Sequence, residues 1–106
     1  MIKRNFEETS EIREWIREWV RREPEGEHLS IKEVAHVVLC LRDIVLWYNG
    51  SLSGYDLDPF MVAVVKNDFV RACGEADDVN ERVLPLYAKF LYNNLPGDWR
   101  ERAEKI

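Results

Sequence analysis

Cysteine is scarce in this sequence, and its only two cysteines stand far apart. Cys40 and Cys73 both lie within apolar stretches of the chain, so they predict reduced thiols in the core, with a single buried disulfide as the alternative. A signal peptide is missing, and so is a run of about 18 apolar residues, which a membrane-spanning helix needs. These absences predict a cytoplasmic protein that does not enter a membrane.

An excess of basic residues is missing as well. The formal net charge is −5, and residues 56–98 carry eight acidic and four basic side chains, a net of −4. A protein that binds nucleic acid directly is expected to show a basic face, and no segment here has one beyond the neighbouring Arg21 and Arg22. We therefore expect no direct nucleic-acid partner. The acidic segment leaves open an acidic mimic of nucleic acid.

Catalytic and cofactor-binding motifs are also absent from the sequence. It contains no CxxC pair, no HExxH motif and no glycine-rich phosphate loop among its 5 glycines. The best metal-ligand candidates are His36 and Cys40, four residues apart, with His28 as a third. Cys40 also fits a core position, and His36 fits the polar edge of its helix. We predict no metal site, no cofactor and no enzymatic activity.

The sequence does contain enough apolar residues for one folded domain. Its 106 residues are 46% hydrophobic, and a chain of this length buries roughly two thirds of its surface on folding. Apolar residues recur with helical spacing, and no repeat or long linker divides the chain. We predict an all-α fold, a single compact bundle over residues 1–106. Its four to five helices are expected at residues 9–22, 31–48, 59–73, 78–94 with a kink at Pro85, and in a short C-terminal stretch from Trp99.

Capping residues support these boundaries. A short polar side chain before a helix accepts a hydrogen bond from a free backbone amide, and asparagine or glycine after a helix allows the chain to turn away. The signals are the Ser30/Glu33 capping box, the Asn49-Gly50 stop, the Asp58-Pro59 start and the Asp77-Asp78 start with Glu81. The segments at residues 31–48 and 60–73 are the most apolar, so we expect the core to be built mainly from them.

The first predicted helix is apolar along one narrow stripe and charged elsewhere. Ile12, Trp15, Ile16 and Trp19 occupy the i, i+3, i+4 and i+7 positions of one helix face. Two tryptophans at such positions are normally part of the core. Because the helix lies at one end of the chain and is otherwise strongly polar, the stripe could instead be a dimer seam or a docking face for another protein. The exposure of these side chains separates the two interpretations.

Asn67 and Asp68 interrupt the apolar run of the third predicted helix. Asp68 falls on the same helix face as Met61 and Ala72, so we expect it to be partly buried and hydrogen-bonded. The alternative is that Asn67 and Asp68 contact a ligand in a polar pocket. The other residues expected beside Asp68, as partners or as pocket residues, are Asn80, Arg82 and Tyr92.

An ordered set of short motifs runs through residues 59–99. The motifs are Ala63-Val64-Val65-Lys66-Asn67-Asp68-Phe69, Ala76-Asp77-Asp78 and Phe90-Leu91-Tyr92-Asn93, followed by Pro96 and Trp99. In order and spacing this set resembles short helical proteins of unknown function that recur in tailed phages and mobile elements. The resemblance implies a phage or mobile-element origin and a compact helical fold, but no activity. It also makes Asn67, Asp68, Tyr92 and Asn93 parts of one motif, which we interpret as a hydrogen-bonded core.

These observations predict a non-enzymatic accessory protein that binds another protein, or a second copy of itself, through an apolar helix face. A small-ligand-binding or enzymatic domain with a polar pocket around Asn67 and Asp68 is the alternative. The acidic mimic of nucleic acid is a third hypothesis.

Overall fold

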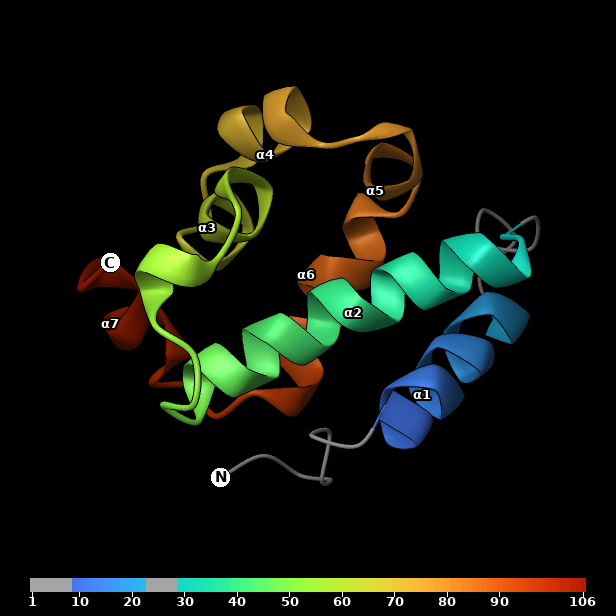
Figure 1. Ribbon diagram of the computed structural model, residues 1–106, viewed down its shortest axis with the longest axis horizontal. Helices are drawn as coiled ribbons and strands as arrows, with labels where there is room; N and C mark the ends of the chain where they lie inside the picture. Colours follow the sequence, from blue (N-terminus) through green and yellow to red (C-terminus); the bar gives the residue numbers. More distant parts are fainter. Residues whose placement is uncertain (1–8, 23–28) are drawn as a thin grey trace.

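Helices make up all of the regular structure in the computed structural model, which describes residues 9–22 and 29–106 (Figure 1). The predicted all-α class is confirmed, although two predicted helices are divided. The α-helices are α1 Thr9–Arg22, α2 Ile31–Tyr48, α3 Pro59–Val65, α4 Phe69–Glu75, α5 Asp78–Arg82, α6 Leu84–Asn94 and α7 Trp99–Glu104, and a short 3-10 helix, η2, covers Gly54–Asp56. No helix among the described residues is long and apolar enough to cross a membrane.

Helix α2 runs through the middle of the fold, with α1 along one side and α3 to α5 on the other (Figure 1). The predicted capping box starts it: Ser30 Oγ accepts from the Glu33 amide at 3.1 Å, and Glu33 Oε1 accepts from the Ser30 amide at 2.9 Å. The predicted stop also holds, since Asn49 is the C-cap and Gly50 has a φ of +84°. Side chains from both faces of α2 are buried, as a central helix requires.

The apolar stripe of α1 lies in the core of the chain. Ile12 and Ile16 are completely buried, and Trp15 and Trp19 are only 6% and 3% exposed. Trp15 packs edge-on against Phe90 of α6, with 5.0 Å between the ring centroids. The interface role predicted for these four side chains is therefore corrected, because side chains that are buried within the chain are not available to a partner.

The predicted helix over residues 59–73 is wrong, because the chain turns between α3 and α4. Asp58 caps α3 as predicted, accepting from the Met61 amide at 3.0 Å. Asn67 then adopts a left-handed backbone with a φ of +57°, a conformation that asparagine tolerates better than most residues. Asp68 follows as the N-cap of α4 and accepts from the Arg71 amide at 3.2 Å. Its side chain is exposed, which corrects the expectation that it is partly buried.

The predicted kinked helix over residues 78–94 is two helices, α5 and α6, which meet at Val83. Pro85 lies in the first turn of α6, where its missing backbone N–H breaks no helical hydrogen bond. Of the two aspartates expected to open this helix, Asp77 is the N-cap of α5 and accepts from the Asn80 amide at 2.8 Å, whereas Asp78 is the first helical residue.

The short C-terminal helix expected from Trp99 is present as α7, and polar contacts fasten it to the end of α2. Asp98 accepts a 2.6 Å hydrogen bond from the Tyr48 hydroxyl. Arg102 donates to the Tyr48 carbonyl and lies over the Tyr48 ring, 4.2 Å from its centroid. Trp99 and Ala103 are also buried, so α7 packs against the rest of the fold beside α3.

Candidate functional site

The predicted polar residues do not gather into one site. Asn67, Asp68, Tyr92 and Asn93 are all exposed, so the hydrogen-bonded core interpreted from their shared motif is wrong. The physical reason is the turn at Asn67, which shifts Asp68 off the buried face of α3 and makes it a helix cap. Asp68 therefore accepts from its own helix rather than from Asn80, Arg82 or Tyr92.

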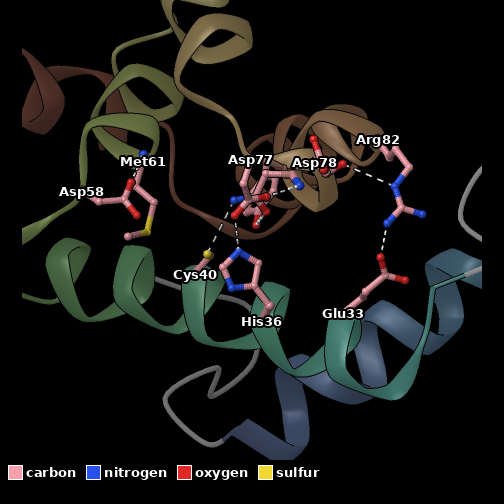
Figure 2. A network of polar contacts seen from close by, with 10 residues as sticks. Glu33, His36, Cys40, Asp58, Met61, Asp77, Asp78 and Arg82 are labelled. Carbon is pink, nitrogen blue, oxygen red and sulfur yellow. Dashed lines mark hydrogen bonds and ion pairs between the residues drawn. The ribbon is translucent and has the colours of Figure 1, made fainter.

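Arg82 belongs instead to a set of contacts that hold α5 against α2. Figure 2 shows Glu33, His36 and Cys40 on α2 facing the segment that carries Asp77 and Arg82. Arg82 pairs with Glu33, and His36 Nε2 lies 2.7 Å from Asp77 Oδ2. Burial acts to raise the pKa of Asp77, but the hydrogen bonds from the Asn80 amide and from His36 outweigh it and lower that pKa. These pairs position α5.

The metal-ligand candidates do not converge in the part of the chain that the structure describes. His36 faces Asp77, while Cys40 is buried beside Asn80. No group of three or more histidine, cysteine or acidic side chains that could hold a metal ion occurs within residues 9–22 and 29–106. His28 lies outside the described residues. Cys40 and Cys73 are both free thiols, and Cys73 is only partly buried.

A buried polar contact that the sequence analysis missed joins Tyr87 to Asn80. The Tyr87 hydroxyl donates to Asn80 Oδ1 at 2.6 Å, and Asn80 Nδ2 lies 3.9 Å from Cys40 Sγ. Burial raises the pKa of both Tyr87 and Cys40, so their environment disfavours the ionised form of each group. Asn80 and Tyr87 are seven residues apart, but the break at Val83 means that this spacing does not mark one helix face.

A concave surface of about 500 Å³, which we call the α6 groove, lies among the described residues. One wall comes from α3 and α4 with the turn between them, the other from α6, and α5 and α7 contribute to its ends. Its apolar lining includes Ala63, Val64, Ala72, Leu84, Leu91 and Trp99. Of the predicted site residues, Asn67, Asp68 and Tyr92 line it, whereas Asn80, Arg82 and Asn93 do not.

Two large exposed aromatic side chains stand on the walls of the α6 groove. Phe69 of α4 is 71% exposed and Tyr92 of α6 is 78% exposed, and both contribute to the lining. Val70, beside Phe69, is also exposed. An exposed apolar patch next to a concave apolar surface is typical of a binding site.

The charged groups of the groove lie at its edge. Asp68, Glu81 and Arg100 contribute to the lining, and all three are exposed. The Arg100 guanidinium stands over the Trp99 ring, 5.3 Å from its centroid. Two buried lining residues, Tyr87 and Trp99, carry a polar side-chain atom, and the Tyr87 hydroxyl is already bonded to Asn80. The groove thus combines an apolar interior with a charged edge.

No protein-family model, curated protein or solved structure matches this chain. The phage and mobile-element resemblance therefore stays a prediction.

Proposed function

We propose that this chain is a protein-binding module whose α6 groove receives apolar side chains of a partner protein. The observation that carries this proposal is the pairing of an apolar concavity with two exposed aromatic side chains, Phe69 and Tyr92. Burying such aromatic surface is a main source of binding energy at protein interfaces. Binding of another protein through an apolar surface is also what the sequence predicts, but the surface proposed here is the α6 groove and not the α1 stripe.

The polar groups of the groove favour a protein partner over a small polar ligand. Small-molecule sites orient their ligand with a few polar groups placed inside the pocket. Here Asn67, Asp68, Glu81 and Arg100 are all exposed at the edge. This arrangement of an apolar centre with a polar rim is the usual anatomy of a protein interface.

The wider role that we propose is that of a non-enzymatic accessory protein of phage or mobile-element type in the cytoplasm. The motifs of residues 59–99 support the origin. The free thiols of Cys40 and Cys73 support a reducing compartment. These points extend the binding proposal, and the experiment below does not depend on them.

A groove-filling substitution tests the binding proposal. Ala88 lies on the exposed part of α6 and lines the groove, so Ala88→Arg fills the groove without disturbing the core. A display library of amphipathic helical peptides is selected on the immobilised wild-type chain, and the affinities of the enriched peptides are measured by fluorescence anisotropy. We expect Ala88→Arg to weaken binding at least tenfold. Asn93→Arg adds the same side chain to α6 outside the lining and should leave the affinity unchanged.

If no peptide is enriched on the wild type over Ala88→Arg, the protein-binding proposal is wrong. Size-exclusion chromatography with light scattering on the wild-type protein shows in addition whether a second copy of the chain is the partner. If the protein stays monomeric at high concentration, the groove binds a different protein and not a second copy.

A small apolar ligand is the second candidate. The observation that favours it is the cavity volume of about 500 Å³, which falls within the roughly 300–1,000 Å³ of ligand pockets. An environment-sensitive apolar dye serves as the probe. One-to-one dye binding that Ala88→Arg abolishes, with no peptide enriched, would support this candidate over a protein partner.

A further inference from the structure

Two side chains of opposite charge lie toward opposite ends of the α6 groove. Glu81 belongs to α5, directly before α6 begins at Leu84, and Arg100 belongs to α7, which follows the end of α6. Figure 1 shows α5 and α7 on opposite sides of the fold, with α6 between them. An occupant that lies along α6 therefore meets an acidic group toward one end and a basic group toward the other.

The apolar lining of α6 is the right length for a short helix. Leu84, Ala88 and Leu91 are spaced i, i+4 and i+7 on one face of α6, a span of about 10 Å at 1.5 Å per residue. A helical occupant presents its own i, i+4 and i+7 side chains over the same length. Addition of a strand is not available here, because the described residues contain no strand edge.

Arg100 differs from Arg102, the other arginine of α7, in what it contacts. Arg102 is used within the fold, where it contacts Asp98 and Tyr48. The Arg100 side chain lies over the Trp99 ring, and no carboxylate pairs with it within the described residues. The chain thus presents one arginine of α7 to the groove and fixes the other to α2.

Other charged side chains lie near Arg100 or in the α6 groove. Asn67 and Arg100 also line an adjoining recess of about 200 Å³, together with Lys66 and Glu104. Lys66 Nζ donates to the Ile106 carbonyl at 3.2 Å. Asp68 contributes a carboxylate to the groove, but its Oδ1 accepts from the Arg71 amide. Arg100 is the only basic side chain that lines the α6 groove itself among the described residues.

We propose that the occupant of the α6 groove is an amphipathic helix with an acidic residue at the Arg100 end of its apolar stripe and a basic residue at the Glu81 end. The proposal rests on the function proposed above and specifies the chemistry of the partner. Opposite charges at the two ends give the bound helix one direction along α6, since the reverse direction brings like charges together.

Parallel selections of one peptide library test this charge pattern. The library keeps three apolar positions at i, i+4 and i+7 and randomises the residues at both ends of the stripe. It is selected on the wild type, on Arg100→Glu and on Arg71→Glu. Arg71 is exposed on α4 and does not line the groove, so its substitution makes the same charge change away from the site.

On the wild type and on Arg71→Glu, we expect enriched peptides to carry an acidic residue at one end and a basic residue at the other. On Arg100→Glu, a basic residue should replace the acidic one. Peptides selected on the wild type should bind Arg100→Glu about three- to tenfold more weakly, the size expected for exposed charge pairs.

Enriched peptides that lose affinity for Ala88→Arg but show no charge bias would overturn this inference and leave the proposed function standing. An absence of peptides enriched over Ala88→Arg would refute the proposed function itself. An equal effect of Arg71→Glu and Arg100→Glu would show that net charge, and not a paired residue, sets the preference, and would also overturn the inference.

Discussion

The Tyr87 hydroxyl donates a 2.6 Å hydrogen bond to Asn80 Oδ1 in the interior, and this bond ties α6 to α5. Tyr87 is completely buried and Asn80 is 3% exposed. A buried polar group that loses its partner keeps the full cost of leaving water, about 1–3 kcal/mol. The pair therefore fixes how α5 is placed relative to the wall of the α6 groove.

Asn80→Ala should lower the free energy of unfolding by about 1–3 kcal/mol, because it leaves the Tyr87 hydroxyl buried without this acceptor. Tyr87→Phe should have a similar effect, because it removes the donor to Asn80. The double variant should lose less than the sum of the two single losses, since no unpaired partner remains. Urea unfolding of the four proteins measures this difference. Strictly additive losses would mean that the hydrogen bond contributes nothing.

The left-handed backbone at Asn67 makes a second prediction about the turn between α3 and α4. Asn67→Val should lower the free energy of unfolding by about 1–2 kcal/mol, because a β-branched side chain is strained at a φ of +57°. Asn67→Gly should not destabilise the chain, because glycine adopts this conformation freely. Asn93→Val, at an exposed position on α6, is the matched control and should change stability by less than about 0.5 kcal/mol. Equal losses for the two valine variants would contradict the turn.

The sequence predicts the helix starts and stops that depend on local chemistry. The Ser30/Glu33 capping box, the Asn49-Gly50 stop and the Asp58-Pro59 start all act within a few residues of one another. Their hydrogen bonds do not depend on the rest of the fold. These boundaries can therefore be derived from sequence alone.

The break after Val65 is harder to predict, because the apolar pattern continues through it. Asn67 and Asp68 are residues that also end and cap helices, and the structure uses them in that way. The start at Asp58-Pro59 and the stop at Gly74, with no recognised turn between them, favour one helix that contains both polar residues. The local residue types are compatible both with a turn and with a buried polar pair. The packing of α4 against α3 decides in favour of the turn.

The α6 groove does not follow from the sequence, because it depends on how separate helices meet. The alternative drawn from the sequence is a polar pocket around Asn67 and Asp68, and both residues line the groove, but its interior is apolar. The apolar interior comes from α3, α4, α6 and α7 together. Nothing in the local sequence around Trp99 or Leu84 indicates that they share a cavity, since that depends on the turns at Asn67 and Val83.

Burial of the α1 stripe makes a prediction that separates a core role from an interface role. Trp15→Ala should lower the free energy of unfolding by about 3–5 kcal/mol, because it leaves a cavity against Phe90. Leu39→Ala, at a position of α2 that is 56% exposed, should cost much less. Urea unfolding and light scattering are measured on the same samples. A Trp15→Ala variant of unchanged stability and altered mass would instead support the dimer-seam interpretation.

The contact between Tyr48 and Asp98 predicts how stability depends on pH. The hydrogen bond from the Tyr48 hydroxyl is the main reason that the pKa of Asp98 lies below its ordinary value of 3.8, and Arg102 lowers it further. A carboxyl group with a lowered pKa in the folded chain contributes stability above its ordinary pKa. That contribution disappears as the pH falls through the lower, folded-state pKa. Acid should therefore weaken the attachment of α7 to α2.

Asp98→Asn should be less stable than the wild type at pH 7 and should lose less additional stability between pH 5 and pH 2, roughly the range over which a paired aspartate titrates. Tyr48→Phe removes the donor to Asp98, so this variant should also lose less stability than the wild type as the pH falls. The urea midpoint is measured across this range for the three proteins. Because Asp77 and Glu33 also have a lowered pKa, part of the acid sensitivity should persist in both variants. If Asp98→Asn loses as much stability as the wild type between pH 5 and pH 2, the Tyr48 contact does not stabilise the carboxylate.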